Sequence, residues 1–359
     1  QKEASFFRSL GAKRVRVTSG PYEAPPNNQA SGMAMFLERN SKVPCNDCLI
    51  TWMQAGLTLE NGSYANAQQG LWLHHGVQLE TGSTDVVCPN GYENLPINWN
   101  RFFASGNERS ATNLCLNGTS KTGYYLSPTS QIWTMLEVMN QTPHPMKGML
   151  TIDYEYLPGP SFPPGFQKLK SVWLDVAGCG NSEVPAVRNA STFDLRSPTP
   201  WTVPKEWPAG RAVITAGHLH DGGTRLQLQR NGESVCDSTA TYGGDPGYVD
   251  GTAMPGMDGM KMEHISHMQT CDVPTVKAGD VFEVQAFYNF TGRPGMVNDD
   301  GTLSPVMGIG MMYFAEGDGE VQKVEGGQRE GMPVVGNEAK EGMERGSENQ
   351  WRRGLEWRA

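Results

Sequence analysis

Short runs of β-branched and aromatic residues, separated by turn residues, recur along most of the chain. No long stretch shows the 3.6-residue period of an amphipathic helix, and Asn231-Gly232 predicts a hairpin turn. The pattern predicts an all-β fold of two consecutive antiparallel, jelly-roll-like β-sandwiches. The predicted strands, each bounded by Gly, Pro, Asn or Asp, are residues 48–59, 70–79, 131–139, 149–156, 169–176, 211–220, 224–230, 280–288 and 306–314.

The segment 157–165, Leu-Pro-Gly-Pro-Ser-Phe-Pro-Pro-Gly, is too rich in Pro and Gly to continue a central strand. We therefore expect a domain boundary there, with one sandwich in residues 1–160 and the other in residues 166–314. Residues 315–359 are Gly-rich, mixed in charge and poor in apolar side chains, which predicts a disordered tail.

Composition limits the classes of partner. The chain has 359 residues, of which 38% are hydrophobic and 19% charged, enough to bury two cores. No apolar run approaches the roughly 20 residues of a spanning helix, so we expect no membrane partner. The net charge of −9 makes nucleic acid an unexpected partner as well.

Seven cysteines favour an oxidising compartment. Cys45-x-x-Cys48 predicts a disulfide rather than a zinc site, because no second cysteine or histidine pair follows at zinc-finger spacing. Cys236 and Cys271 form a second candidate pair, and the odd total leaves at least one thiol without a partner in the chain. The start at Gln1 is interpreted as a mature form whose leader was removed. We therefore expect a secreted, extracellular glycoprotein, with sequons at Asn61, Asn117, Asn140, Asn189 and Asn289.

Four of the seven histidines fall in two tight motifs, His74-His75 and His218-Leu-His220. Residues i and i+2 of a strand share a face, so His218 and His220 can bind one metal ion. Met307 is the candidate third ligand, and its soft thioether favours copper over zinc. The alternative is a strand that carries two surface histidines and no metal.

His74 and His75 are adjacent, so on a regular strand they point to opposite sides. They can share one metal only where the strand bulges or ends, and Gly76 permits such a departure. Otherwise both are structural. His264 and His267, in a methionine-rich stretch, are expected to be structural too.

The order and spacing of these motifs resemble the copper type II, ascorbate-dependent monooxygenases, which include peptidylglycine α-hydroxylating monooxygenase and dopamine β-monooxygenase. His74-His75 resembles that family's pair at the electron-transfer copper, and His218-Leu-His220 resembles its pair at the catalytic copper. The segment 276–289 resembles the strand and turn that precede its methionine ligand, here Met307. The resemblance implies two sandwiches with one copper each across a solvent-filled cleft. It also implies ascorbate or a similar reductant, dioxygen, and hydroxylation of the substrate.

Two positions depart from that family. Met139, in Met135-Leu-Glu-Val-Met-Asn140, stands where the family has its third histidine ligand at the first copper. We expect Met139, ahead of His144, to complete that site and to make its reduced copper a poorer electron donor. Ala216 replaces the arginine that holds a peptide carboxylate, so a glycine-extended peptide is not the expected substrate.

The first half also resembles the stress-up-regulated nodulin-like proteins, through the strings at residues 44–48, 70–75 and 101–109. Three functions stay open at this point. The first is a copper-dependent monooxygenase that acts on a small-molecule or polymer substrate. The second is a non-catalytic copper-binding or stress protein. The third is a metal-free sandwich that binds a polymer or a partner protein.

Overall fold

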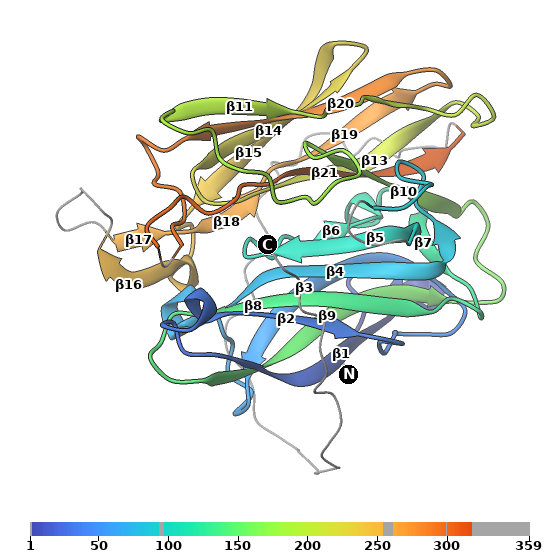
Figure 1. The fold of residues 1–359 in the computed structure, drawn as a ribbon. Helices are drawn as coiled ribbons and strands as arrows, with labels where there is room; N and C mark the ends of the chain where they lie inside the picture. Colours follow the sequence, from blue (N-terminus) through green and yellow to red (C-terminus); the bar gives the residue numbers. More distant parts are fainter. Residues whose placement is uncertain (1, 93–96, 254–260, 299, 318–359) are drawn as a thin grey trace.

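The computed structural model describes residues 2–92, 97–253, 261–298 and 300–317 (Figure 1). Within them the regular structure is strands, joined by short 3-10 turns, which confirms the all-β prediction. The turns are η1 (Arg8–Leu10), η2 (Ala30–Gly32), η3 (Ala67–Gln69), η4 (Leu116–Gly118) and η5 (Pro246–Tyr248). No described helix is long and apolar enough to cross a membrane.

The first half of the chain supplies two layers. One is a four-stranded sheet in the order β2-β8-β4-β5, and the other contains β1-β9-β3-β7 with β6 on β3. Their bounds are β1 (Lys13–Ala24), β2 (Met33–Glu38), β3 (Cys48–Leu59), β4 (Leu71–Thr84), β5 (Trp99–Gly106), β6 (Thr112–Asn113), β7 (Thr122–Leu126), β8 (Ile132–Asn140) and β9 (Met146–Pro158).

The second half also forms two layers. The strands β10-β21-β13-β19 face a six-stranded sheet in the order β11-β20-β14-β15-β18, with β12 on β20, and β16 pairs with β17. Their bounds are β10 (Gln167–Asp175), β11 (Thr192–Arg196), β12 (Trp201–Thr202), β13 (Gly210–Leu219), β14 (Gly223–Arg230), β15 (Glu233–Tyr242), β16 (Val249–Ala253), β17 (Lys261–Glu263), β18 (Ile265–Met268), β19 (Thr270–Val276), β20 (Val281–Asn289) and β21 (Gly308–Glu316).

One sheet runs through both halves. A short parallel pairing joins β7 to β10, where Thr122 lies opposite Gln167 and Gly123 opposite Lys168. The resulting nine-stranded sheet follows the order β1-β9-β3-β7-β10-β21-β13-β19, with β6 paired to β3 beside that path. In Figure 1, β21 and β13 lie between the strands β11, β20 and β14 and the strands β5 and β4. The division into domains at 157–165 stays a prediction.

β21 is buried on both faces, because it separates two hydrophobic cores. Met307, just before the strand, and Ile309, Met311 and Tyr313 pack into the core shared with the first half. The alternate residues, including Met312 and Phe314, pack into the core of the second half. This arrangement brings one face of β21 and of its neighbour β13 towards the first half.

Several local predictions are confirmed. β3 has the predicted bounds, and the hairpin turn at Asn231-Gly232 has φ values of 55° and 83°. The predicted tail was placed too early, because backbone pairing with β10 and β13 carries β21 through Ala315 and Glu316. Residues 318–359 lie outside the described part of the chain.

The disulfide predictions are also confirmed. Cys45 pairs with Cys48, and Cys236 pairs with Cys271. A third disulfide, between Cys88 and Cys179, joins the two halves of the chain. Cys115 is the free cysteine, and it is buried.

Candidate metal centre

The four clustered histidines come together from two strands that belong to different halves of the chain. His74 and His75 lie on β4. Between Leu73 and His75 the pairing with β8 shifts register, so His74 is the extra residue of a β-bulge. The bulge meets the condition under which adjacent histidines can share one site: the rings of His74 and His75 lie 4.0 Å apart, centroid to centroid.

The second pair lies at the end of β13. His218 pairs with Ile309, and Leu219 pairs with Gly308. Because directly opposite residues of an antiparallel pair share a face, His218 lies on the Ile309 face, which belongs to the core shared with the first half. His220 follows one residue after β13 ends, and its ring lies 5.1 Å from the ring of His74.

His75 and His220 approach each other through one nitrogen atom of each ring. Their Nε2 atoms are 3.0 Å apart. The Nδ1 of His220 lies 2.8 Å from the carbonyl oxygen of Pro305, which can only accept, so this nitrogen carries the hydrogen. The Nδ1 of His75 lies 2.6 Å from Glu137 Oε2, and it donates while Glu137 is ionised. Both Nε2 atoms therefore present lone pairs to the same point.

His218 has the same arrangement. Its Nδ1 lies 3.2 Å from Glu108 Oε1, and its Nε2 is buried without a hydrogen-bond partner. The ring fits only because residue 106 is glycine: a Cβ built there would lie 2.4 Å from Cε1 of His218. Gly106 is also the register partner of His75. Gly106 therefore allows His218 of the second half to pack closely against β5, next to His75 on β4.

A carboxylate joins the cluster. Ligand atoms of His74, His75, His220 and Glu183 all lie within 4.8 Å of one another. Glu183 precedes Val184, which forms an isolated bridge with Val306 close to Met307. Burial, and then the negative charge of Glu137, raise the pKa of Glu183 to about 7.

Burial also controls the charge of the imidazoles. It lowers the pKa of His74 and of His75 well below 6.5, and the neighbouring histidines lower both further. Burial, followed by the charge of His218, lowers the pKa of His220 to about 4. Burial acts on His218 in the same direction, but the carboxylate of Glu108 outweighs it and raises that pKa. At neutral pH at least three of the rings are therefore neutral, the state in which imidazole binds a metal.

These features fit a metal such as copper. The rings of His75 and His220 have Nδ1 bound to an acceptor while Nε2 remains available, which is how metal-ligating histidines are held in proteins. His218 has a similar Nδ1 contact, with Glu108, but it is outside the group of ligand atoms that lie within 4.8 Å of one another. Imidazole suits copper, zinc and iron, so the donor set admits copper without selecting it.

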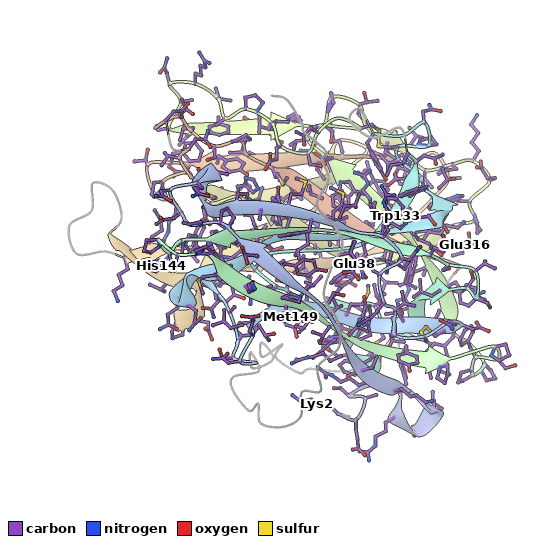
Figure 2. All side chains as sticks on the ribbon, turned by 60° about the horizontal axis from the view of Figure 1, so that its bottom comes forward. Lys2, Glu38, Trp133, His144, Met149 and Glu316 are labelled. Atoms are coloured by element: carbon purple, nitrogen blue, oxygen red, sulfur yellow. A yellow bond between two sulfur atoms is a disulfide. The ribbon has the colours of Figure 1, made fainter. Side chains whose placement is uncertain are left out.

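The predicted methionine ligands lie close to this centre along the backbone. Continuing the β13–β21 register by one residue places Met307 opposite His220, and Met307 is buried. Met139 is opposite Trp72 and lies two residues from Glu137, on the same face of β8. Their roles as ligands stay predictions. His144, the substitute for Met139, is exposed in a loop at the edge of the molecule (Figure 2).

The remaining histidines differ in their surroundings. His264 is buried, its Nδ1 lies 2.5 Å from Asp221 Oδ2, and its ring lies 4.6 Å from that of Trp72. His267 is exposed and lies 3.4 Å from the hydroxyl of Ser110.

Sequence reasoning missed the acidic residues and the glycine of this centre. Glu108, Glu137, Glu183 and Gly106 form no motif with the histidines, and they contact them only through the tertiary fold. Two signals were present: Glu137 lies two residues before Met139, and Gly106 and Glu108 lie in the string at residues 101–109, both strings having been singled out above.

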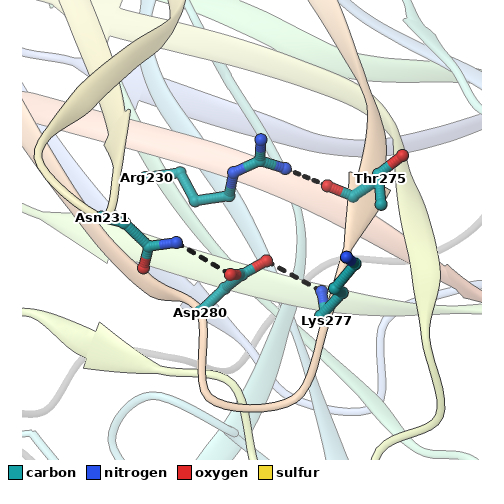
Figure 3. A pocket seen from close by; sticks show the side chains of 5 residues that line it. All are labelled: Arg230, Asn231, Thr275, Lys277 and Asp280. Atoms are coloured by element: carbon teal, nitrogen blue, oxygen red, sulfur yellow. Dashed lines mark hydrogen bonds between the residues drawn. The ribbon is translucent and has the colours of Figure 1, made fainter.

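The cavity in Figure 3 is not part of this centre. Its volume is about 240 Å³, and it lies beside the β14–β15 turn. The Asp280 carboxylate there accepts hydrogen bonds from the Asn231 side chain and from the Lys277 backbone. The lining, which contains no histidine, is Arg230, Asn231, Thr275, Lys277 and Asp280.

No family model matches the chain. Two solved structures of the peptide-N4-(N-acetyl-β-D-glucosaminyl)asparagine amidase type, one from Flavobacterium meningosepticum, align over 86% and 85% of this chain and 98% and 96% of theirs. Their identities are 11% and 10% and their TM-scores 0.38 and 0.39, too low to support a functional argument.

Two relatives match over most of their length. "Probable copper-dependent oxygenase M1" of Phoma sp. is 33% identical over 314 residues, 87% of this chain and 75% of the relative. "Probable copper-dependent oxygenase clz3" of Cochliobolus lunatus is 32% identical over 277 residues, 77% of this chain and 82% of the relative. With the histidine centre described above, these matches show that the chain belongs to the family of the probable copper-dependent oxygenases.

Proposed function

We propose that this protein is a copper-dependent monooxygenase-like hydroxylase, whose copper is held by the histidine centre and which uses dioxygen and a reductant such as ascorbate. The observation that carries the proposal is the pair of facing Nε2 atoms of His75 and His220, 3.0 Å apart, in two rings whose Nδ1 atoms each face an acceptor, so that the lone pair is assigned to each Nε2. Two lone pairs at that distance repel unless a cation lies near them. Copper bound there would supply the one-electron and dioxygen chemistry of an oxygenase.

The chain's own residues prepare the centre. Glu137, Glu108 and the Pro305 carbonyl hold the Nδ1 atoms, which fixes the ring orientations. The adjoining core, which includes Ile309 and Met311, limits the access of bulk water. Glu183, with its pKa of about 7, can hold or release a proton at its carboxyl oxygen near neutral pH.

The number of coppers is part of the proposal. The resemblance noted above implied one copper in each half, with His75 and His220 at different ions. We propose instead one shared centre, because the two rings come within hydrogen-bonding distance. Met307 and Met139 are proposed as additional soft ligands. The copper type II, ascorbate-dependent monooxygenases and the nodulin-like proteins remain the proposed wider relationship.

The proposal also covers the location of the protein and its partners. Three disulfides and the sequons support a secreted, extracellular glycoprotein. The substrate would be a small molecule or a polymer, and we expect neither nucleic acid nor a membrane as a partner, given the net charge of −9.

Copper stoichiometry after reconstitution tests the proposal, measured on the intact protein and on His75→Ala, His220→Ala and His144→Ala. A shared centre predicts that His75→Ala and His220→Ala lose the same copper, whereas the exposed His144→Ala retains it. Two coppers in the intact protein, with one lost in each of the first two variants, would restore the two-site arrangement. No copper in any variant would leave the metal-free sandwich.

Ascorbate-driven oxygen consumption then separates an oxygenase from a non-catalytic copper protein. The copper-loaded intact protein should consume oxygen, and His220→Ala should not. Bound copper without oxygen consumption over a broad substrate panel would favour copper storage or a stress role.

A further inference from the structure

Arg109 is a buried cation without a counter-charge among the residues that the structure describes. Its residue is 3% exposed, and none of its Nε, Nη1 and Nη2 atoms has a hydrogen-bond partner. The other buried arginine of this segment, Arg101, differs, because its Nε lies 2.9 Å from Asp85. No described carboxylate forms an ion pair with Arg109.

The fold holds Arg109 in place through its backbone and one aromatic ring. Its φ of 45° lies in the left-handed region, which is a strained conformation for a non-glycine residue. The backbone N–H donates to Gly106 O at 3.2 Å, and the carbonyl accepts from Gln54 Nε2 at 3.1 Å. Its Cζ lies 4.7 Å from the centroid of the Tyr64 ring. The guanidinium is therefore positioned by groups that leave its donors unused.

An arginine cannot escape this cost by losing its proton. An uncompensated buried charge strongly destabilises a protein, and a strained backbone adds to that cost. Such a group is retained where a ligand provides the opposite charge. The planar fork of five N–H donors matches a carboxylate, which it binds through two parallel hydrogen bonds.

Arg109 directly follows a residue that contacts the metal centre. The preceding residue, Glu108, holds Nδ1 of His218, and the Tyr248 hydroxyl donates to the Glu108 carbonyl at 3.2 Å. We propose that the Arg109 guanidinium is a binding site for the carboxylate group of a small organic acid. If the proposed function holds, that acid belongs to the substrate class; the binding site itself does not depend on that function.

The site is tested on copper-free protein with acetate as the probe and acetamide as its neutral isostere. Acetate should raise the melting temperature in a saturable way, because a ligand of the folded state stabilises it by mass action. Acetamide should have no effect. Arg109→Met should bind acetate at least 10-fold more weakly, and it should fold, because it removes an unpaired buried charge at similar volume. Arg225→Met, at an exposed arginine near Asp237, is the matched control and should respond like the intact protein.

Arg109→Lys provides a second variant, with the charge but without the fork, and should bind acetate more weakly than the intact protein. Equal responses to acetate and chloride would show a site for any small anion and overturn the assignment to carboxylates. An intact protein that does not respond to acetate would show that water satisfies the guanidinium, and the proposal would fail. Because copper is absent throughout, either result leaves the copper test unaffected.

Discussion

His75 on β4 and His220 after β13 lie with their Nε2 atoms 3.0 Å apart, although 145 residues separate them in the chain. Each ring uses Nδ1 for an acceptor of its own half: Glu137 on β8 for His75, and the Pro305 carbonyl for His220. Each half therefore orients its own imidazole, and the centre forms where the two halves meet. The expected properties of the protein follow from this division.

Loss of the carboxylate behind His75 should weaken copper binding without removing a ligand. Glu137→Gln keeps an oxygen near Nδ1 but removes the charge that favours the correct tautomer. We expect about 10-fold weaker copper binding, the lower end of the effect of such partners, measured by competition with a chelator. Glu60→Gln, at an exposed position, should match the intact protein. Unchanged affinity in Glu137→Gln would show that Glu137 does not orient His75 in the metal-bound state.

The glycine under His218 should be required for the centre. Gly106→Ala places a Cβ 2.4 Å from the His218 ring, which must move away from β5. We expect lower copper occupancy and a lower melting temperature. Gly82→Ala is the matched control on β4, because a Cβ there meets nothing within 4 Å. If Gly106→Ala binds copper like the intact protein, His218 is not held against β5 as described.

The copper-free protein should lose stability on mild acidification. His220 has its pKa lowered from 6.5 to about 4, first by burial. Between these values the unfolded chain binds a proton that the folded chain does not, so the free energy of unfolding falls as the pH falls. The loss from this residue is on the order of 3 kcal/mol and ends near pH 4.

Denaturant unfolding from pH 7 to pH 4 measures this effect. His220→Gln, which cannot titrate, should show a shallower pH dependence than the intact protein. Equal slopes would mean that His220 is not buried in its neutral form. The comparison uses slopes, so a general loss of stability in the variant does not disturb it.

The disulfide between Cys88 and Cys179 should contribute most among the three to stability. It closes a segment of 91 residues, for which chain entropy predicts about 4–5 kcal/mol. The Cys45–Cys48 bridge spans 3 residues and should contribute less than about 2 kcal/mol. Urea unfolding of the two double Cys→Ala variants compares them. The opposite ranking would show that strain in the folded state, not loop entropy, governs these bridges.

The sequence by itself determined the all-β class, several of the strands and one hairpin turn, because those depend on local preferences; strands such as β1, β2, β5 and β7 were not predicted. A run rich in apolar, β-branched and aromatic residues defines β3 with its correct bounds, and Asn231-Gly232 defines the β14–β15 turn, since two consecutive positive φ values suit these residues. The histidine motifs were visible for a similar reason, because chemistry concentrated within three residues can be read locally. A bulge at His74-His75 was stated only as the condition under which adjacent side chains could share one metal, and the structure has that bulge.

Only the tertiary structure decided how these motifs combine. Glu108, Glu137, Glu183 and Gly106 acquire their roles through register and through the packing of β13 and β21 against β4 and β5. The solitary charge of Arg109 is equally invisible in the sequence, because burial and the absence of a described partner are properties of the folded surroundings. Contacts between residues more than a hundred positions apart depend on how whole sheets pack, and no local pattern specifies that packing.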